Sequence, residues 1–222
     1  MSEDNIVFRV ATWLIPLVVA IILHEIAHGW TALAFGDPTA KRKRRLSLNP
    51  IRHVDPVGTV ILPLVLAVSG APVFGWAKPV PVVARRLRNP RFHMVLVALA
   101  GPGMNLLLAL LGALAWAGLV WLQPAEGLGW DFVALNVANF VVINVSLAIF
   151  NLLPIPPFDG GHVVEGLLPR PLARRYARFG RYGFPILFLL LVVLPLMNIH
   201  LVAQLIGPPI AFILRLLGLP VD

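Results

Sequence analysis

The chain has 222 residues, of which 59% are hydrophobic and only 13% are charged, and its net charge is +8 at pH 7. A soluble domain carries about 25% charged residues, so this composition excludes a water-soluble monomer, a disordered chain and a nucleic-acid-binding protein, and it indicates a polytopic membrane protein. Because there is no cysteine, a disulfide framework and a thiolate metal site are also excluded, and any bound metal must be held by His, Asp or Glu.

Apolar runs recur along the chain, and a full membrane span needs about 20 such residues. They predict an all-α polytopic membrane protein with five to six hydrophobic segments in a single membrane-embedded domain, 1–222. The runs cover 6–35, 56–74, 95–122, 132–153 and 184–219. The last run, in a carboxy-terminal hydrophobic region of about 183–220, is interrupted by Pro195, Gly207, Pro208 and Pro209. It is therefore one span with a short hairpin or two short spans, and it serves as a substrate gate or as a scaffold.

Basic residues gather in three segments, 41–52, 75–92 and 169–181, whereas the 123–131 turn has none. By the positive-inside rule we expect the basic segments to face the cytoplasm, beside an anionic inner leaflet. Two of them flank the 56–74 run, so we expect that run to enter the membrane and return as a re-entrant element that borders a cavity. An ordinary span with one misplaced loop is the alternative.

The first run contains His24-Glu25-Ile26-Ala27-His28, the pattern H-E-x-x-H. On a helix the two histidines lie one turn apart on one face, where both imidazoles can bind one zinc ion, and Glu25 can act as general base on a water beside the metal. Ionisable side chains inside a span are costly and usually functional, which favours a metal site over an unliganded cluster. If the helix ends near Gly36, the site lies within the cytoplasmic half of the membrane.

A catalytic zinc ion needs three protein ligands and an open position for water. Asp159 is the candidate third ligand, because it follows a proline-rich stretch, 154–157, that cannot continue a helix. Gly160 and Gly161 then let the backbone pass close to other groups. His162 is the rival ligand, and a capping Asp in a helix-terminating loop is the alternative without a metal.

Two separated motifs carry a family resemblance. H-E-x-x-H at 24–28 and Asn151-x-x-Pro-x-Pro-Pro-x-Asp159-Gly-Gly together resemble the site-2 protease family of intramembrane zinc metalloproteases, and 100–105 resembles that family's Gly-Pro-x-x-Asn helix start. The resemblance covers a catalytic core of about 6–166 built on three helices, in a compact form without PDZ or CBS domains. It implies that His24, His28 and Asp159 bind one zinc ion, that Glu25 is the catalytic base, and that Asn151 contacts the substrate or the oxyanion.

The expected activity is therefore hydrolysis of peptide bonds within transmembrane helices of membrane-anchored substrates, as in regulated intramembrane proteolysis, in a bacterial or archaeal cell membrane. Such a substrate must first unwind, and either the re-entrant run or a short strand at 46–49 could hold it extended. The alternative function is a metal-handling or transport protein in which the His/Asp cluster is a transit site. Glu25 favours the protease, because a transit site does not need an acid that is not itself a ligand.

Weaker signals concern polar and aromatic residues near these motifs. Asn136, Asn139 and Asn144 either form helix–helix hydrogen bonds or face the cavity. Asn144 is the better cavity candidate, because it lies seven residues before Asn151, nearly on the same helical face. Trp76 and Lys78 suit anchors at the membrane interface.

Overall fold

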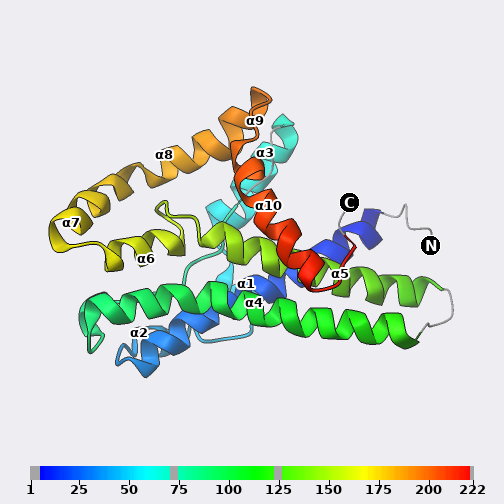
Figure 1. The fold of residues 1–222 in the computed structure, drawn as a ribbon, viewed down its shortest axis with the longest axis horizontal. Helices are drawn as coiled ribbons and strands as arrows, with labels where there is room; N and C mark the ends of the chain where they lie inside the picture. Colours follow the sequence, from blue (N-terminus) through cyan, green and yellow to red (C-terminus); the bar gives the residue numbers. More distant parts are fainter. Residues whose placement is uncertain (1–5, 71–74, 123–126, 221–222) are drawn as a thin grey trace.

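The structure is a computed structural model that describes residues 6–70, 75–122 and 127–220. Every regular element in these ranges is helical, so the predicted all-α fold is confirmed (Figure 1). The helices are α1 (Ile6–Ala34), α2 (Thr39–Arg42), α3 (Leu62–Ser69), α4 (Pro90–Leu122), α5 (Leu128–Asn151), α6 (Asp159–Leu167), α7 (Arg170–Phe179), α8 (Gly183–Phe188), α9 (Leu194–Leu196) and α10 (Leu201–Leu216). Short 3-10 turns occur at Pro50–His53, Ala84–Arg86 and Gly180–Tyr182, and π-helical turns occur at Pro56–Ile61 and Leu189–Val193.

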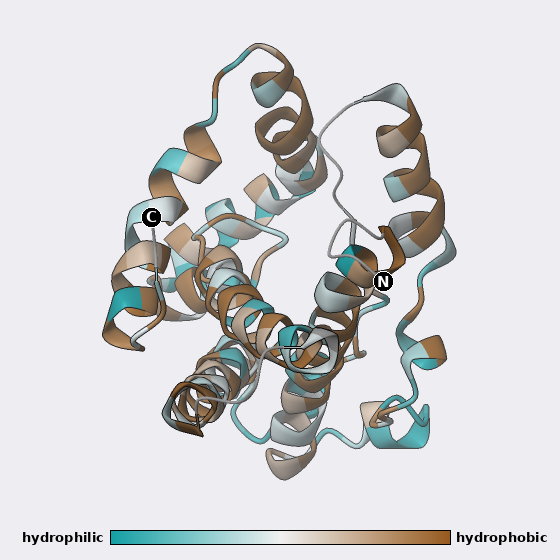
Figure 2. Ribbon diagram, turned by 90° about the vertical axis from the view of Figure 1, so that its right-hand side faces the viewer, coloured by the Kyte–Doolittle hydropathy of each residue, from teal (hydrophilic) through white to brown (hydrophobic). Residues whose placement is uncertain are grey.

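The three longest helices, α1, α4 and α5, pack on one another and run side by side (Figure 1). Small residues allow the close approach: Ala20 on α1, Ala109 on α4 and Ala148 on α5 have no exposed surface. On the outside, α4 exposes large apolar side chains such as Leu107 and Leu114, and Figure 2 shows how hydrophobic the long helices are. A surface of this kind is suited to contact with lipid.

The described residues hold four helical segments long and apolar enough to cross a membrane. They are Ile6–Ala34, Pro90–Leu122, Gly129–Asn151 and Arg170–Leu196, and two shorter apolar helices, Pro56–Ser69 and Leu201–Leu216, accompany them. The fourth segment is a composite, because its first part is the arginine-rich α7 and only the part from α8 onward is apolar. Four of these segments could span a membrane by length and composition, and the count of five to six hydrophobic segments stays a prediction.

The 56–74 run forms a π-helical turn that continues into α3, and its last residues, 71–74, lie outside the described residues. Asp55 caps the start of this helix by accepting hydrogen bonds from the backbone N–H groups of Val57 (3.1 Å) and Gly58 (2.8 Å). The chain that follows comes back to the same place: the Trp76 N–H donates to the Gly58 carbonyl (3.1 Å), and the Lys78 N–H donates to the His53 carbonyl (2.8 Å). The stretches of chain before and after this helical segment therefore lie close together.

The prediction of a short strand at 46–49 is wrong, because this segment forms a turn. The Asn49 N–H donates to Ser47 Oγ (3.2 Å), Asn49 Oδ1 accepts from the Ile51 N–H (3.0 Å), and His53 Nε2 bonds the Ser47 carbonyl (2.8 Å). These local side-chain bonds satisfy the backbone groups that a strand would offer to a neighbour, and no strand is present anywhere in the described ranges.

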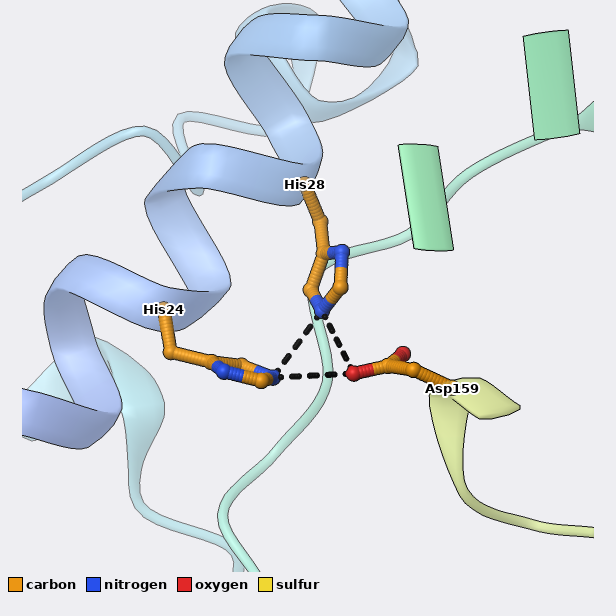
Figure 3. A group of neighbouring side chains, drawn as sticks. All are labelled: His24, His28 and Asp159. Carbon is orange, nitrogen blue, oxygen red and sulfur yellow. Dashed lines mark hydrogen bonds and ion pairs between the residues drawn. The ribbon is translucent and has the colours of Figure 1, made fainter. Parts of the chain in front are cut away.

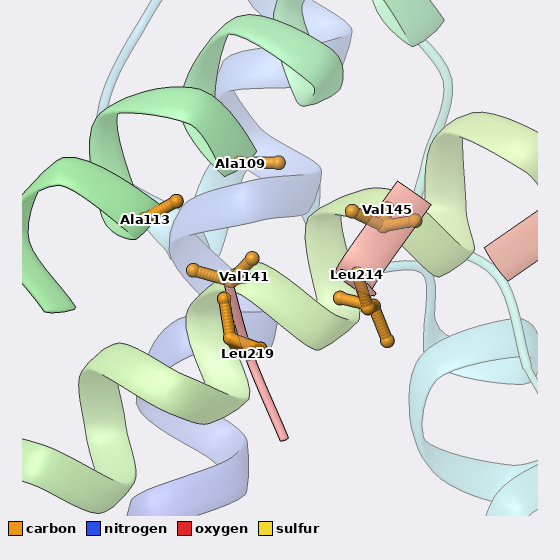
Figure 4. Close-up of a cluster of buried hydrophobic side chains, with 6 residues drawn as sticks. All are labelled: Ala109, Ala113, Val141, Val145, Leu214 and Leu219. Carbon is orange, nitrogen blue, oxygen red and sulfur yellow. The ribbon is translucent and has the colours of Figure 1, made fainter. Parts of the chain in front are cut away.

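The carboxy-terminal region divides into two parts with different surroundings. Leu214 and Leu219 pack on the helix core, in a buried cluster with Val141 and Val145 of α5 and with Ala109 and Ala113 of α4 (Figure 4). The preceding segment, α8 with its π-helical turn, instead places Phe184, Leu187 and Leu191 on the wall of a large cavity. The α10 part is therefore scaffold, whereas the α8 part borders the cavity.

Candidate active site

The structure brings together the three residues predicted as metal ligands (Figure 3). His24 and His28 project from α1, and Asp159 is the first residue of α6. Asp159 Oδ2 lies 3.2 Å from His24 Nε2 and 3.3 Å from His28 Nε2, and the two Nε2 atoms are 3.0 Å apart. Both histidines are buried, and the three atoms lie close enough together to hold one metal ion.

The hydrogen bonds of Nδ1 in the two imidazoles determine whether Nε2 carries a proton. His28 Nδ1 lies 2.7 Å from the Val97 carbonyl, which can only accept, so this nitrogen carries the proton. His24 Nδ1 lies 2.6 Å from Asn105 Oδ1, which is also an acceptor. A neutral imidazole with a protonated Nδ1 has a bare lone pair on Nε2. Two lone pairs and the buried Asp159 Oδ2, which has no hydrogen-bond partner, therefore converge on one point, and a bound cation would stabilise this arrangement.

The chain reaches Asp159 through a tight reversal between α5 and α6. Prolines at 154, 156 and 157 end the α5 helix, and the backbone of the new helix begins directly against the end of the old one. A Cβ atom at Gly160 would lie 2.5 Å from the Leu152 carbonyl carbon and 2.5 Å from the Leu153 carbonyl oxygen, so only glycine fits. This close approach sets the Asp159 carboxylate opposite the two histidines of α1.

The site also uses Gly101 and Asn105 of α4, which the sequence presents only as part of a family motif. A Cβ atom at Gly101 would lie 2.5 Å from Cε1 of His28 and 2.6 Å from Cε1 of His24, so glycine leaves the space that both imidazoles fill. Asn105, one turn later and fully buried, accepts the His24 Nδ1–H. Such outer partners fix the orientation and the tautomer of a metal-binding histidine.

Asn144 hydrogen-bonds Asn105 and does not line the cavity, so the helix–helix hydrogen bond is confirmed and the preferred cavity position is wrong. Asn144 has no exposed surface; its Oδ1 accepts from Asn105 Nδ2 (2.8 Å), and its own Nδ2 donates to the Phe140 carbonyl (2.8 Å). Asn151 lies about 10 Å further along the helix axis and does reach the cavity wall, where its Nδ2 donates to the Leu147 carbonyl (2.9 Å). One of the two amide hydrogens of Asn151 is therefore used within α5.

Glu25 lines the same cavity as the three candidate ligands and is held by an extended segment, 79–83. Its Oε2 accepts a hydrogen bond from the Val80 N–H (2.6 Å). The other end of the segment is fixed by Asp37, whose Oδ2 accepts from the Val83 N–H (2.6 Å). Two carboxylates from α1 and the turn after it thus hold the segment along the helix that carries the histidines.

Asp37 is fully buried and satisfied by several donors. Its Oδ1 accepts from both the backbone N–H (3.0 Å) and the hydroxyl of Thr39, and Arg86 lies 4.0 Å away. Burial alone would raise the pKa of Asp37, but the hydrogen bonds from Thr39 and Val83 and the charge of Arg86 outweigh it, so the pKa lies below its ordinary value. Asp37 is therefore ionised at neutral pH.

The cavity itself has a volume of about 1320 Å³ and extends from the histidines to α7 and α8. His162 lies on its wall with its Nδ1 3.9 Å from Glu165 Oε2. It does not belong to the group of described residues that could hold a metal ion. Trp76 also borders the cavity and meets Phe184 edge-on, with 5.6 Å between ring centroids. His53, by contrast, is buried against the 46–49 turn, away from this site.

Comparisons with known proteins place the chain in a family. The sequence profile of Peptidase family M50 matches residues 125–194. "Putative zinc metalloprotease YwhC" of Bacillus subtilis is 42% identical over 187 residues, which cover 82% of this chain and 80% of the relative. "Putative zinc metalloprotease Rip2" of Mycolicibacterium smegmatis is 33% identical over 190 residues, covering 85% of this chain and 68% of the relative, and the Mycobacterium tuberculosis (strain H37Rv) protein of the same name is 33% identical over 194 residues, covering 86% and 69%.

No solved structure matches the chain. The matches with these relatives cover most of this chain, and the relatives' names describe zinc metalloproteases. The apolar helices of the chain are long enough to cross a membrane several times. The chain therefore belongs to the M50 metalloproteases, the site-2 protease family, and is a multi-pass integral membrane protein.

Proposed function

We propose that the protein is an intramembrane zinc endopeptidase that hydrolyses peptide bonds within transmembrane helices of membrane-anchored substrates, as in regulated intramembrane proteolysis. The observation that carries this proposal is the convergence of two imidazole lone pairs and one carboxylate oxygen at the wall of a large cavity that Glu25 also lines. Two nitrogens and one oxygen are a ligand set that zinc takes in catalytic sites. His24, His28 and Asp159 would hold the ion.

When bound, zinc polarises the scissile carbonyl and lowers the pKa of water. Glu25 takes a proton from the attacking water and passes it to the leaving amide nitrogen. The Val80 N–H holds Oε2 of Glu25 in place and leaves the other carboxylate oxygen for the proton. Asn151 donates its second amide hydrogen to the developing oxyanion, since its first is used by the Leu147 carbonyl.

The orientation in the membrane follows from charge and length. The three basic segments support an active site in the cytoplasmic half of a cell membrane, beside an anionic leaflet. Pro56–Ser69 spans at most about 21 Å as a helix, less than the roughly 30 Å of a bilayer core. This length and the return of the chain to His53 and Gly58 support a re-entrant element rather than a full span.

A metal-transit function is less well supported. Glu25 lies outside the group of three ligands, and a backbone N–H holds it at the cavity wall. A fixed acid beside the ligands suits proton transfer, whereas a transit site has no need of it. The names of the relatives also describe metalloproteases and not transporters.

The experiment compares zinc content and substrate cleavage in purified, reconstituted protein. We expect one zinc ion per chain in wild type, and zinc loss in Asp159→Ala and in His24→Ala but not in the matched control His162→Ala. Glu25→Gln should keep zinc and lose cleavage, because glutamine can still accept the Val80 N–H but cannot take the proton. Cleavage by Glu25→Gln at the wild-type rate would refute the protease, and zinc loss in His162→Ala equal to that in Asp159→Ala would refute the ligand set.

A further inference from the structure

The arginines of α7 and of the turn after it divide between two faces. Arg170, Arg174 and Arg181 line the cavity, with Ala173 and Ala177 between them, whereas Arg175 and Arg178 do not line it. Residues three and four apart share one face of a helix, so the three cavity arginines and the two alanines form a continuous wall of charge and small side chains. Figure 1 places α7 beyond α6, away from the packed helices α1, α4 and α5. We call Arg170, Arg174 and Arg181 the basic wall.

The arginines of the basic wall are not neutralised by an ion pair within the described part of the chain. None of its three guanidinium groups forms an ion pair there, and Arg181 uses its Nε only to donate to the Arg178 carbonyl (3.0 Å). Apart from Glu25 and Asp159 at the metal site, the carboxylate on the cavity wall is Glu165, whose neighbour within 4 Å is His162. Guanidinium groups bind carboxylates with two parallel hydrogen bonds, so this wall is suited to an acidic occupant.

The distance from the metal site sets where such an occupant would sit. Asp159 begins α6, which has nine residues and so extends for about 13 Å before the chain reaches α7. An extended chain covers about 3.3–3.6 Å per residue. α7 then folds back, since a Cβ atom at Gly180 would lie 3.6 Å from Cβ of Pro156, so the wall approaches the metal site again at its far end. A substrate held extended from the metal site would therefore lie along the basic wall within about six residues of the scissile bond.

We propose that the basic wall binds acidic residues of the substrate, within about six positions to the cytoplasmic side of the cleaved bond. This inference rests on the proposed proteolytic function and names the substrate class. Cytoplasmic flanks of membrane proteins are enriched in Lys and Arg, so the wall repels ordinary membrane proteins and admits those with an acidic flank. Selection by repulsion of the wrong partner as well as attraction of the right one is a common source of specificity.

Anionic lipid is a second candidate occupant of the basic wall, and the distribution of the arginines over two faces of α7 argues against it. Head groups of the surrounding leaflet would contact Arg175 and Arg178, which do not line the cavity. The basic wall instead shares its space with Glu25 and Asp159, where the substrate must lie. The two remaining arginines therefore provide a matched control on the same helix.

The test uses the full-length zinc-loaded protein in phosphatidylcholine vesicles with a designed single-span substrate. Three versions of the substrate carry four Glu, four Gln or four Lys in the cytoplasmic flank, and the cleaved bond is located by mass spectrometry. At about 50 mM NaCl we expect kcat/KM to be about tenfold higher for the Glu version than for the Gln version, with the Lys version slowest. At about 500 mM NaCl the difference should shrink toward one, because exposed charges are screened.

Charge reversal on each of the two faces of α7 then distinguishes an acidic substrate from lipid as the occupant of the basic wall. Arg170→Glu/Arg174→Glu should lower the Glu-to-Gln ratio to one or below, whereas Arg175→Glu/Arg178→Glu, with the same change in net charge, should keep it. Equal rates for all three substrates with wild type would overturn the proposal, and this arm needs no variant to fold. An equal loss of preference in both double variants, or a preference that appears only when phosphatidylglycerol is added, would overturn it in favour of lipid.

The same assay keeps the two proposals apart. Cleavage that depends on Glu25 but ignores the flank would overturn the basic-wall proposal alone. No cleavage of any version by wild type, or cleavage that persists in Glu25→Gln, would overturn the proteolytic function and the basic-wall proposal with it.

Discussion

Replacement of Asn105 by leucine should weaken metal binding without touching a ligand. Asn105 Oδ1 accepts the Nδ1–H of His24 at 2.6 Å, and its Nδ2 donates to Asn144 Oδ1 at 2.8 Å. Leucine has a similar size but neither group. In the variant the buried Nδ1–H of His24 has no acceptor, so the proton is no longer held on Nδ1 and can occupy Nε2, where it blocks the lone pair that binds metal.

The magnitude follows from the buried groups that lose their partners. An unsatisfied buried donor costs about 1–3 kcal/mol, and loss of an outer partner of a metal-binding histidine lowers metal affinity by about 10–100-fold. The two estimates agree, since a tenfold change in affinity corresponds to about 1.4 kcal/mol. The unpaired Asn144 Oδ1 should in addition lower the free energy of unfolding by a similar amount, with or without metal.

The assay is competition for zinc with a coloured chelator in detergent micelles, together with thermal unfolding of the metal-free protein. Asn105→Asp is the matched control, because aspartate keeps an acceptor for His24 and loses the Nδ2 donor to Asn144 and to the Ala20 carbonyl. We expect Asn105→Asp to bind zinc at least as tightly as wild type although it is less stable. Wild-type zinc affinity in Asn105→Leu would refute the role assigned to Asn105.

Three further predictions concern the space, the clamp and the topology around the site. Gly101→Ala should lower zinc affinity about tenfold or more, because its Cβ overlaps both imidazoles. Gly103→Ala, where nothing lies within 4 Å, is the control. Equal effects of the two substitutions would show that the space at Gly101 does not matter for the imidazoles. Asp37→Asn should lower the free energy of unfolding by about 1–3 kcal/mol at pH 7. Because the pKa of Asp37 is lowered in the folded state, its stabilising contribution is complete above about pH 4 and is lost below, so the difference from wild type should shrink on acidification. A difference independent of pH would count against the ionised Asp37. Single cysteines at Arg52 and Arg85, in a chain without native cysteine, should react with an impermeant maleimide from the same side of the membrane, and labelling from opposite sides would exclude the re-entrant element.

Local sequence patterns were sufficient for the residues whose roles depend on near neighbours. His24 and His28 lie one helical turn apart wherever a helix forms, and the prolines before Asp159 must break the α5 helix, so both halves of the candidate metal site are readable from the sequence. The partners of these residues are not, because they lie far away along the chain. His24 meets Asn105 81 residues later, and Glu25 meets the Val80 N–H 55 residues later.

The wrong predictions have the same physical origin. Helical periodicity put Asn144 on the face of Asn151, but two turns of helix separate them, and at that depth the neighbour is Asn105 of α4 instead of the cavity. The alternating pattern at 46–49 fits a strand equally well as a turn whose side chains bond the backbone, and only the contacts with Ile51 and His53 decide between them. Apolar composition likewise cannot separate α10, which packs on the core, from α8, which borders the cavity.

Under the proposed function, a metal site inside the membrane cuts a peptide bond inside a transmembrane helix. The most direct measurement is to locate, by mass spectrometry, the bond that the reconstituted zinc protein cleaves in a single-span substrate, with Glu25→Gln alongside. We expect a cut within the apolar span for wild type and no cut for the variant, while both retain zinc. A cut confined to the water-exposed flank of the substrate, or the same cut made by Glu25→Gln, would contradict the proposed function.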